Sequence, residues 1–491
     1  MQITSPRARY EKRVVIFVVS LLFFAGFLAV PQVAYSKDFS SIIGSSHASG
    51  KYYFTDRDFV NEGAIAVAKA GMRVIKIWFD DPAGYYMWNS NWPDKFDNYV
   101  EMARHPYYQE LFNRPFETYV LTLFHKVDFH DGVPDPLPME VEQRYYELAK
   151  HLLLTYRGTG KTFIIGHHEG DWHLRGTTKR TPEYDPSEKS IQGMIRWYKA
   201  RQRGVDRAKR EIPAADIRVF HAAEVNLVKF AMEGRPTVTN NVLPYVNCDL
   251  VSYSAYDTSI HTHREENEAR WRKIFRQALD YIDTKVADKP PFGSKNIFIS
   301  EYGGPEQQWG GDGEAAEQLS RLCKATIEEA AAWGCPYIIY WQVYCNECCQ
   351  GGDDPCIAVG GSHRGARPAK SNRDCRGFWM IKPDGTHSSA WDYFTSLTKP
   401  YLAAPDDFTA KLWVDQKKVR LAWTESPDKA SSRLEKSVNR NPYILVDNSP
   451  VGRTFYDDSD IKPGNKYRYR VRFEKNKYPP TSWFYTRQIQ Y

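Results

Sequence analysis

Short apolar runs alternate with longer amphipathic stretches over most of this chain, from about residue 40 to residue 400. A short apolar run without polar alternation is typical of a parallel strand buried on both faces, whereas apolar positions every three or four residues indicate a helix. The runs predict eight strands, the first closing at Ile43 and the others covering residues 73–79, 119–125, 162–167, 217–222, 250–254, 297–299 and 337–341. The clearest helices between them are predicted over residues 139–156, 186–211, 263–286 and 314–333.

Eight rounds of strand and helix predict a parallel sheet, and closure into a (β/α)8 TIM barrel is the usual outcome at eight strands. An open, doubly wound sheet is the alternative. It is less favoured because no glycine-rich phosphate-binding loop follows the first strand. The fold class expected for residues 37–403 is therefore an α/β barrel.

The pattern changes after Ala404, where strands with strict alternation are separated by turn residues. Residues 419–423 and 467–473 alternate in this way, which predicts a small antiparallel, immunoglobulin-like β-sandwich over residues 404–491. This stretch resembles a fibronectin type III domain, with Trp423 at the place of the early core Trp and Tyr467 at that of the corner Tyr. Nothing in it points to catalysis.

The amino terminus has the composition of an export signal. Four basic residues precede an apolar run over residues 14–30, and Ala34-Tyr35-Ser36 suits signal peptidase. We expect residues 1–36 to be a cleaved signal peptide and the protein to be secreted or periplasmic. The competing interpretation is an uncleaved anchor, which is the one case in which a membrane would be a partner.

The net charge and the cysteine content indicate which partners and which cross-links to expect. Residues 1–36 carry four basic side chains and one acidic, so their removal lowers the formal net charge from +6 to +3, and no nucleic-acid partner is implied. All 8 cysteines lie between Cys248 and Cys375. In an exported protein this even number predicts disulfides, with a zinc site at the Cys345-x-x-Cys348 spacing as the alternative.

Two glutamates follow predicted strands at the end of a barrel where chemistry is done. Glu301 closes the apolar run 297–299, and Glu169 follows the fourth strand. A pair of carboxyl groups across a barrel mouth is what cleavage of a glycosidic bond requires, because one must protonate the departing oxygen while the other attacks or activates water.

At these residues the chain resembles glycoside hydrolase clan A, a group of retaining barrels. The sequence Ile299-Ser-Glu301-Tyr-Gly matches the nucleophile motif of the clan. The resemblance implies Glu301 as the nucleophile and Glu169 as the acid/base. It also implies that Tyr256 hydrogen-bonds the nucleophile and that Trp341 stacks on a sugar. The expected substrate is a poly- or oligosaccharide, and no metal or cofactor is expected.

The chain departs from the clan at the acid/base motif. His168 precedes Glu169 where the clan has Asn, which leaves the sugar preference open, and Ser254 replaces a His of the clan. Trp172 is expected to stack on sugar beside Glu169. His125 and His221, near the ends of the third and fifth strands, are expected to hydrogen-bond sugar hydroxyls.

Three alternatives remain open at this stage. Glu224 also ends a strand and is a rival for the acid role. A barrel that binds carbohydrate without cleaving it would explain the altered acid motif. A metal-dependent hydrolase could draw its ligands from a group of nearby polar residues, namely His167, His168, Asp171, His173 and His221.

Overall fold

The structure is a computed structural model of the chain. It describes residues 38–124, 127–129, 132–213, 216–259, 267–349, 367–398, 402, 404–476, 478 and 480–491. The predicted signal peptide and His125 lie outside these residues. Within the described residues, no helix is both long and apolar enough to cross a membrane.

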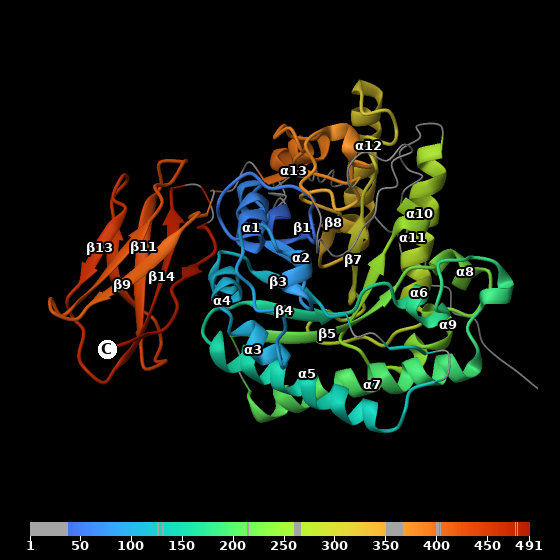
Figure 1. The fold of residues 1–491 in the computed structure, drawn as a ribbon, viewed down its shortest axis with the longest axis horizontal. Coiled ribbons are helices and arrows are strands. Elements are labelled where there is room, and N and C mark those ends of the chain that lie inside the picture. Colours follow the sequence, from blue (N-terminus) through green and yellow to red (C-terminus); the bar gives the residue numbers. More distant parts are fainter. Residues whose placement is uncertain are drawn as a thin grey trace, which may run out of the picture. The chain divides into compact units, whose positions relative to one another are not determined.

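Eight parallel strands close into a barrel in the order β1 to β8, with β8 pairing back onto β1 (Figure 1). The predicted barrel is thus confirmed, and the open-sheet alternative is wrong. The strands are β1 (Ile43–His47), β2 (Val74–Trp78), β3 (Thr118–Thr122), β4 (Thr162–Gly166), β5 (Arg218–Val225), β6 (Leu250–Ser254), β7 (Ile297–Tyr302) and β8 (Ile338–Tyr340).

Helices follow the strands and surround them, as Figure 1 shows for α5, α7, α11 and α12. The helices are α1 (Phe59–Lys69), α2 (Pro82–Tyr85), α3 (Tyr99–Ala103), α4 (Pro106–Asn113), α5 (Pro136–Thr155), α6 (Gly170–Arg175), α7 (Glu188–Glu211), α8 (Val228–Met232), α9 (Val238–Asn241), α10 (Tyr256–Ser259), α11 (Glu268–Asp283), α12 (Gly313–Trp333) and α13 (Ser389–Thr398).

The first strand differs from its prediction. It begins at Ile43, where it was expected to close, and continues through Gly44 and two serines to His47. Glycine and serine are poor strand formers, so the apolar pattern did not reveal it. The structure explains the glycine, because a Cβ at Gly44 would lie 2.5 Å from the carbonyl oxygen of Val74 on β2.

The interior of the barrel has two layers of different chemistry. The layer near the amino ends of the strands is apolar and contains Val74, Val120, Ile164, Ala222, Leu250, Phe298 and Ile339. Two residues further along each strand, side chains point inward again. These positions are polar and include Lys76, Thr122, Glu224, Ser252 and Ser300, all buried. The polar layer forms the floor of the barrel mouth.

The carboxyl-terminal strands form two antiparallel sheets, which agrees with the predicted sandwich. One sheet has the order β13-β10-β9 and the other β12-β11-β14-β15, with β16 on β14. The strands are β9 (Phe408–Trp413), β10 (Lys418–Trp423), β11 (Ser431–Val438), β12 (Ile444–Ser449), β13 (Phe455–Asp458), β14 (Lys466–Glu474), β15 (Phe484–Tyr485) and β16 (Ile489–Gln490).

Both aromatic residues singled out in the sandwich are buried and hydrogen-bonded. Trp423 donates its indole N–H to Ser432 Oγ at 2.9 Å. The hydroxyl of Tyr467 accepts from the backbone N–H of Lys462 at 2.6 Å and donates to the carbonyl of the same residue at 3.3 Å. This bond back to the chain five residues upstream is the arrangement expected of a corner Tyr.

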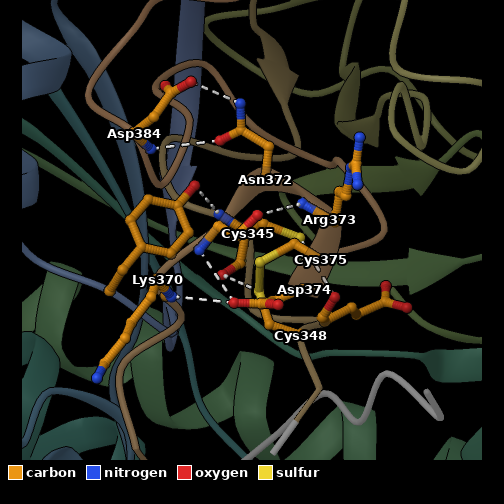
Figure 2. Close-up of a disulfide and its surroundings, with 12 residues drawn as sticks. Cys345, Cys348, Lys370, Asn372, Arg373, Asp374, Cys375 and Asp384 are labelled. Atoms are coloured by element: carbon orange, nitrogen blue, oxygen red, sulfur yellow. Dashed lines mark hydrogen bonds between the residues drawn. A yellow bond between two sulfur atoms is a disulfide. The ribbon is translucent and has the colours of Figure 1, made fainter. Parts of the chain in front are cut away.

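The cysteines are used in two ways. Cys348 and Cys375 form a disulfide, beside which Asp374 accepts hydrogen bonds from the backbone of Lys370 and Ser371 (Figure 2). Cys349 is also disulfide-bonded. Cys345, the first residue of the proposed zinc spacing, is a buried free thiol. Because its partner Cys348 is in a disulfide, this spacing does not supply a pair of zinc ligands.

Candidate active site

The barrel mouth brings together residues from five strands and the turns that follow them. Lys76 comes from β2, Glu224 from β5 and Glu301 from β7. Glu169 follows β4 and caps the amino end of α6, while Trp341 follows β8 directly. Since the strands are parallel, all of these side chains lie at the same end of the barrel.

Glu301 forms a buried ion pair with Lys76. The Nζ atom of Lys76 lies 2.7 Å from Glu301 Oε1, and the two side chains are only 1% and 3% exposed. Burial by itself would lower the pKa of Lys76, but the carboxylates of Glu301 and Glu224 outweigh it and raise this pKa above its ordinary value. Lys76 is therefore cationic and places a positive charge beside Glu301.

A β-bulge turns two consecutive residues of β7 toward the interior. The register between β6 and β7 shifts after Tyr253, so that Ser254 pairs with Glu301. In a regular strand Ser300 and Glu301 would point to opposite faces. Here Ser300 donates its hydroxyl to Glu224 Oε2 at 3.1 Å, while Glu301 reaches Lys76. The bulge is what delivers Glu301 to the mouth.

Glu169 occupies a different environment from Glu301. Its backbone is left-handed, with φ 60° and ψ 48°, and its side chain is 27% exposed. Burial in the mouth, followed by the nearby carboxylates of Glu301 and Glu224, raises the pKa of Glu169 well above its ordinary value. Glu169 therefore holds a proton under conditions in which an isolated glutamate would have lost it.

The two carboxyl groups are close together. One oxygen of Glu169 and one of Glu301 lie within 4.8 Å of each other. His168 Nε2 lies 3.7 Å from Glu301 Oε1 and 3.9 Å from Glu169 Oε1. Burial, together with the charge on Lys76, lowers the pKa of His168 well below its ordinary value. The imidazole is therefore neutral and can act as a hydrogen-bond donor or acceptor for a ligand.

Glu224 is more deeply placed than either of these carboxyl groups. It is 1% exposed, and its Oε1 accepts the backbone N–H of Glu169 at 2.6 Å. Burial is the main reason that its pKa rises to about 7. Because both carboxyl oxygens accept hydrogen bonds, Glu224 is poorly placed to act as the acid in place of Glu169.

Aromatic side chains line the mouth beside the acidic groups. The rings of Trp78 and Trp341 lie 5.6 Å apart, and His168 is 5.4 Å from Trp78 and 4.9 Å from Phe124. The peptide bond between Trp341 and Gln342 is cis. Two buried donors at this end of the barrel, Trp78 Nε1 and Gln342 Nε2, have no hydrogen-bond partner among the described residues.

Tyr256 and Trp172 lie on short helices that follow β6 and β4. Tyr256 begins α10, immediately after Ala255, whose N–H donates to the carbonyl of Glu301 at 2.8 Å. Burial, followed by the carboxylate of Glu301, raises the pKa of Tyr256 well above its ordinary value. Trp172 lies on α6 and is half-buried, with the guanidinium of Arg180 5.4 Å from its ring.

The structure does not bring His221 to this site. Its side chain points out of the barrel, where Nδ1 lies 3.0 Å from Gln202 Oε1 on α7 and the ring is fully buried. His167 also points outward, and its ring packs 4.8 Å from that of Trp197. Strand alternation explains both positions, since His168 and Glu224 take the inward places.

Strand alternation places some of the candidate metal ligands in the barrel mouth and others on the outside of the barrel. His168, Glu169 and Glu301 could converge on one ion, whereas His167 and His221 cannot join them. The ammonium of Lys76 already lies 2.7 Å from Glu301 Oε1 and supplies positive charge there. This arrangement fits a carboxylate site neutralised by lysine better than a metal centre.

Sequence reasoning missed two residues of this site. Lys76 lies in the middle of an otherwise apolar strand, and a charge at such a position is a signal of a buried partner. Ser300 takes an inward place by alternation from Phe298, but a serine there does not by itself indicate a site.

No family model matches the chain, and no curated protein matches it. Among solved structures, the chain is similar to the endo-beta-1,4-mannanase from Thermotoga petrophila, with 12% identity over 93% of this chain and 99% of that one and a TM-score of 0.36. It is also similar to a glycoside hydrolase family 5 enzyme from Prevotella bryantii B14, with 8% identity over 74% of this chain and 96% of that one and a TM-score of 0.41.

A further solved structure is similar over a shorter part of the chain. A Fn3-like protein from Clostridium thermocellum is 23% identical over 17% of this chain and 91% of that one, with a TM-score of 0.15. All of these identities are below 25% and the TM-scores below 0.5, so the likenesses assign neither a family nor an activity. The pairing of the chain's own strands shows the (β/α)8 barrel, and the chemistry depends on the residues of the site.

Proposed function

We propose that this protein is a glycoside hydrolase that cleaves O-glycosidic bonds of a poly- or oligosaccharide with retention of anomeric configuration. The observation that carries the proposal is the approach of Glu169 and Glu301, whose nearest carboxyl oxygens lie within 4.8 Å. Carboxyl groups about 5–5.5 Å apart are typical of retaining enzymes, whereas inverting enzymes separate them by about 6.5–9.5 Å to admit a water molecule.

The environments of the two carboxyl groups support opposite roles. Lys76 places a positive charge beside Glu301, whose carboxylate can attack the anomeric carbon and form a glycosyl-enzyme intermediate. Glu169, with its raised pKa, can give its proton to the departing glycosidic oxygen. Glu169 then removes a proton from water as that water attacks the anomeric carbon, which releases the sugar and returns Glu301 to its carboxylate form.

The remaining features of the mouth suit a carbohydrate ligand. Aromatic faces such as Trp341 are suited to stacking on sugar rings, and the unpaired donors Trp78 Nε1 and Gln342 Nε2 are suited to hydroxyl acceptors. We keep Tyr256 in the proposal as the residue that orients Glu301, and His168 as a partner for a hydroxyl near the reacting carbon.

The test is hydrolysis of a panel of polysaccharides and aryl glycosides by the wild type, Glu301→Gln and Glu169→Gln. Glu301→Gln should abolish turnover while the far-ultraviolet circular dichroism stays unchanged, and the first product observed by NMR should keep the anomeric configuration of the substrate. Unchanged turnover in Glu301→Gln, or an inverted product, would contradict the proposal. Saturable glycan binding by the wild type without any released product would favour the binding-only barrel.

A chelator separates this proposal from metal-dependent hydrolysis. Because Lys76 supplies the positive charge beside Glu301, activity in EDTA should equal activity in buffer. We further propose that the protein is exported and cleaved after Ser36, and amino-terminal sequencing of the protein from culture medium or periplasm should begin at Lys37.

A further inference from the structure

The carboxyl group of Glu224 contacts the backbone of Glu169 and the residue that precedes Glu301. Its Oε1 accepts the backbone N–H of Glu169 at 2.6 Å. Its Oε2 accepts the hydroxyl of Ser300, the residue before Glu301, at 3.1 Å. One rigid, buried side chain from β5 therefore connects the turn after β4 to the bulge in β7.

The turn that carries Glu169 needs such a connection. A non-glycine residue in the left-handed region costs about 1–2 kcal/mol and persists only where its surroundings hold it. Glu169 has φ 60° and ψ 48° at the amino end of α6. Of the described groups, it is the Glu224 carboxyl that takes the N–H of Glu169 itself.

The rest of the turn is fastened to the same strand end by other contacts. Gly170 packs so closely on β5 that a Cβ there would lie 2.1 Å from the carbonyl oxygen of Glu224. The carboxylate of Asp171 accepts the backbone N–H groups of Asn226 and Leu227 at 2.8 and 3.1 Å. These contacts fix where α6 begins, whereas the Glu224 carboxyl fixes the peptide plane from which the Glu169 side chain departs.

We propose that Glu224 is a positioning residue that sets the separation of Glu169 and Glu301 by holding the backbone of the first and the neighbour of the second. This inference rests on the proposed glycosidase function. It also assigns a role to the carboxyl group that sequence reasoning treated as a rival acid.

The position of the charged group nearest to Glu224 supports a role in positioning Glu169 and Glu301. Lys76 pairs with Glu301 at 2.7 Å and is more distant from Glu224, at 3.9 Å. Glu224 therefore works mainly through its hydrogen bonds, which an uncharged amide can partly replace. In Glu224→Gln, the amide oxygen can accept from Glu169 and the amide NH2 can donate to Ser300.

The experiment compares Glu224→Gln, Glu224→Ala and the wild type in crystal structures and in hydrolysis of aryl glycosides. In the structures, Glu224→Ala should let Glu169 leave the left-handed region and widen its separation from Glu301, and Glu224→Gln should keep both. In kinetics, Glu224→Ala should lower kcat about 100-fold with little change in KM, since a displacement near 1 Å can cost that much. Glu224→Gln should stay within about tenfold of the wild type.

The pH profile gives a readout that a merely structural role would not move. The Glu224 carboxylate raises the pKa of Glu169, so its neutralisation in Glu224→Gln should move the basic limb of kcat/KM to lower pH. An unmoved basic limb, or equal loss of kcat in Glu224→Gln and Glu224→Ala, would overturn the inference. So would a folded Glu224→Ala with the wild-type separation of the two carboxyl groups.

If Glu224→Ala does not fold, a matched pair of serine variants tests the same inference. Ser300 and Ser252 both donate to Glu224 Oε2, at 3.1 and 3.4 Å, but only Ser300 adjoins Glu301. Ser300→Ala should lower kcat more than Ser252→Ala, and equal effects would overturn the inference. If the wild type cleaves no glycoside, the proposed function fails, while the crystal structures still decide whether Glu224 sets the separation.

Discussion

The ammonium group of Lys76 lies 2.7 Å from Oε1 of Glu301 at a depth where neither side chain is more than 3% exposed. A buried ion pair adds little net stability, but removal of one partner leaves the other charge without compensation. The stability of the barrel therefore depends on keeping Lys76 and the proposed nucleophile together.

Lys76→Met should lower the free energy of unfolding by about 3 kcal/mol, because it removes one partner of a buried ion pair. The double variant Lys76→Met/Glu301→Gln should recover much of this loss, since it removes both charges. Denaturant unfolding of the wild type and of the single and double variants measures the coupling. Lys429→Met is the control: Lys429 is 71% exposed and should change stability by less than about 0.5 kcal/mol. Strictly additive losses would contradict the coupling.

The basic limb of the pH–rate profile should belong to Glu169. Burial, and then Glu301 and Glu224, raise the pKa of this carboxyl group, so it still carries its proton at a pH where an ordinary glutamate has ionised. Activity should fall as pH rises through that pKa, because the departing oxygen then lacks a proton donor.

The variant Glu169→Gln provides the comparison. It should reduce kcat by about 10²- to 10⁴-fold on substrates with poor leaving groups and much less on 2,4-dinitrophenyl glycosides, whose leaving group needs no proton. With the activated substrate, the first bond cleavage should also lose the basic limb. A basic limb that persists in this variant would assign the acid role to another group, with Glu224 the first to examine.

In the sandwich, Tyr467→Phe should destabilise the fold by about 1–2 kcal/mol, because it leaves the N–H of Lys462 without its acceptor. Activity at 25 °C should stay unchanged, since Tyr467 belongs to β14 of the sandwich whereas Glu169 and Glu301 belong to the barrel. Calorimetric unfolding measures the effect. Tyr478→Phe, at a residue that is 42% exposed, is the matched control and should have no measurable effect. Equal unfolding temperatures for the two variants would refute the role of the Tyr467 hydroxyl.

The sequence allowed the fold to be predicted where burial imposes a simple pattern. Strands β2 and β4 are largely apolar and β6 and β7 begin with apolar residues, because each is covered by helices on one side and by the barrel interior on the other. The inward position of His168 and the outward position of His167 also follow from alternation along β4. Most of strand β1 was not predicted, because its small residues allow a close approach to β2 instead of forming an apolar run.

The site was predictable only as far as it depends on strand order. Parallel strands bring Glu169 and Glu301 to one end of the barrel whatever their neighbours are. The bulge in β7, the left-handed turn at Glu169 and the inward lysine on β2 are tertiary features. The assignment of His221 to the site was wrong. The end of a predicted strand is uncertain by one residue, and a shift of one residue reverses the face on which a side chain lies.

The apolar layer beneath Lys76 and Glu224 closes the barrel on the side opposite the mouth. Protons therefore enter and leave the site from one direction. A bound oligosaccharide that covers the mouth would isolate Lys76, Glu169, Glu224 and Glu301 from bulk solvent, so that the first bond cleavage uses the proton that Glu169 holds when the substrate binds. The protonation state captured at binding, rather than the pH during the reaction, would then decide whether that substrate is cleaved.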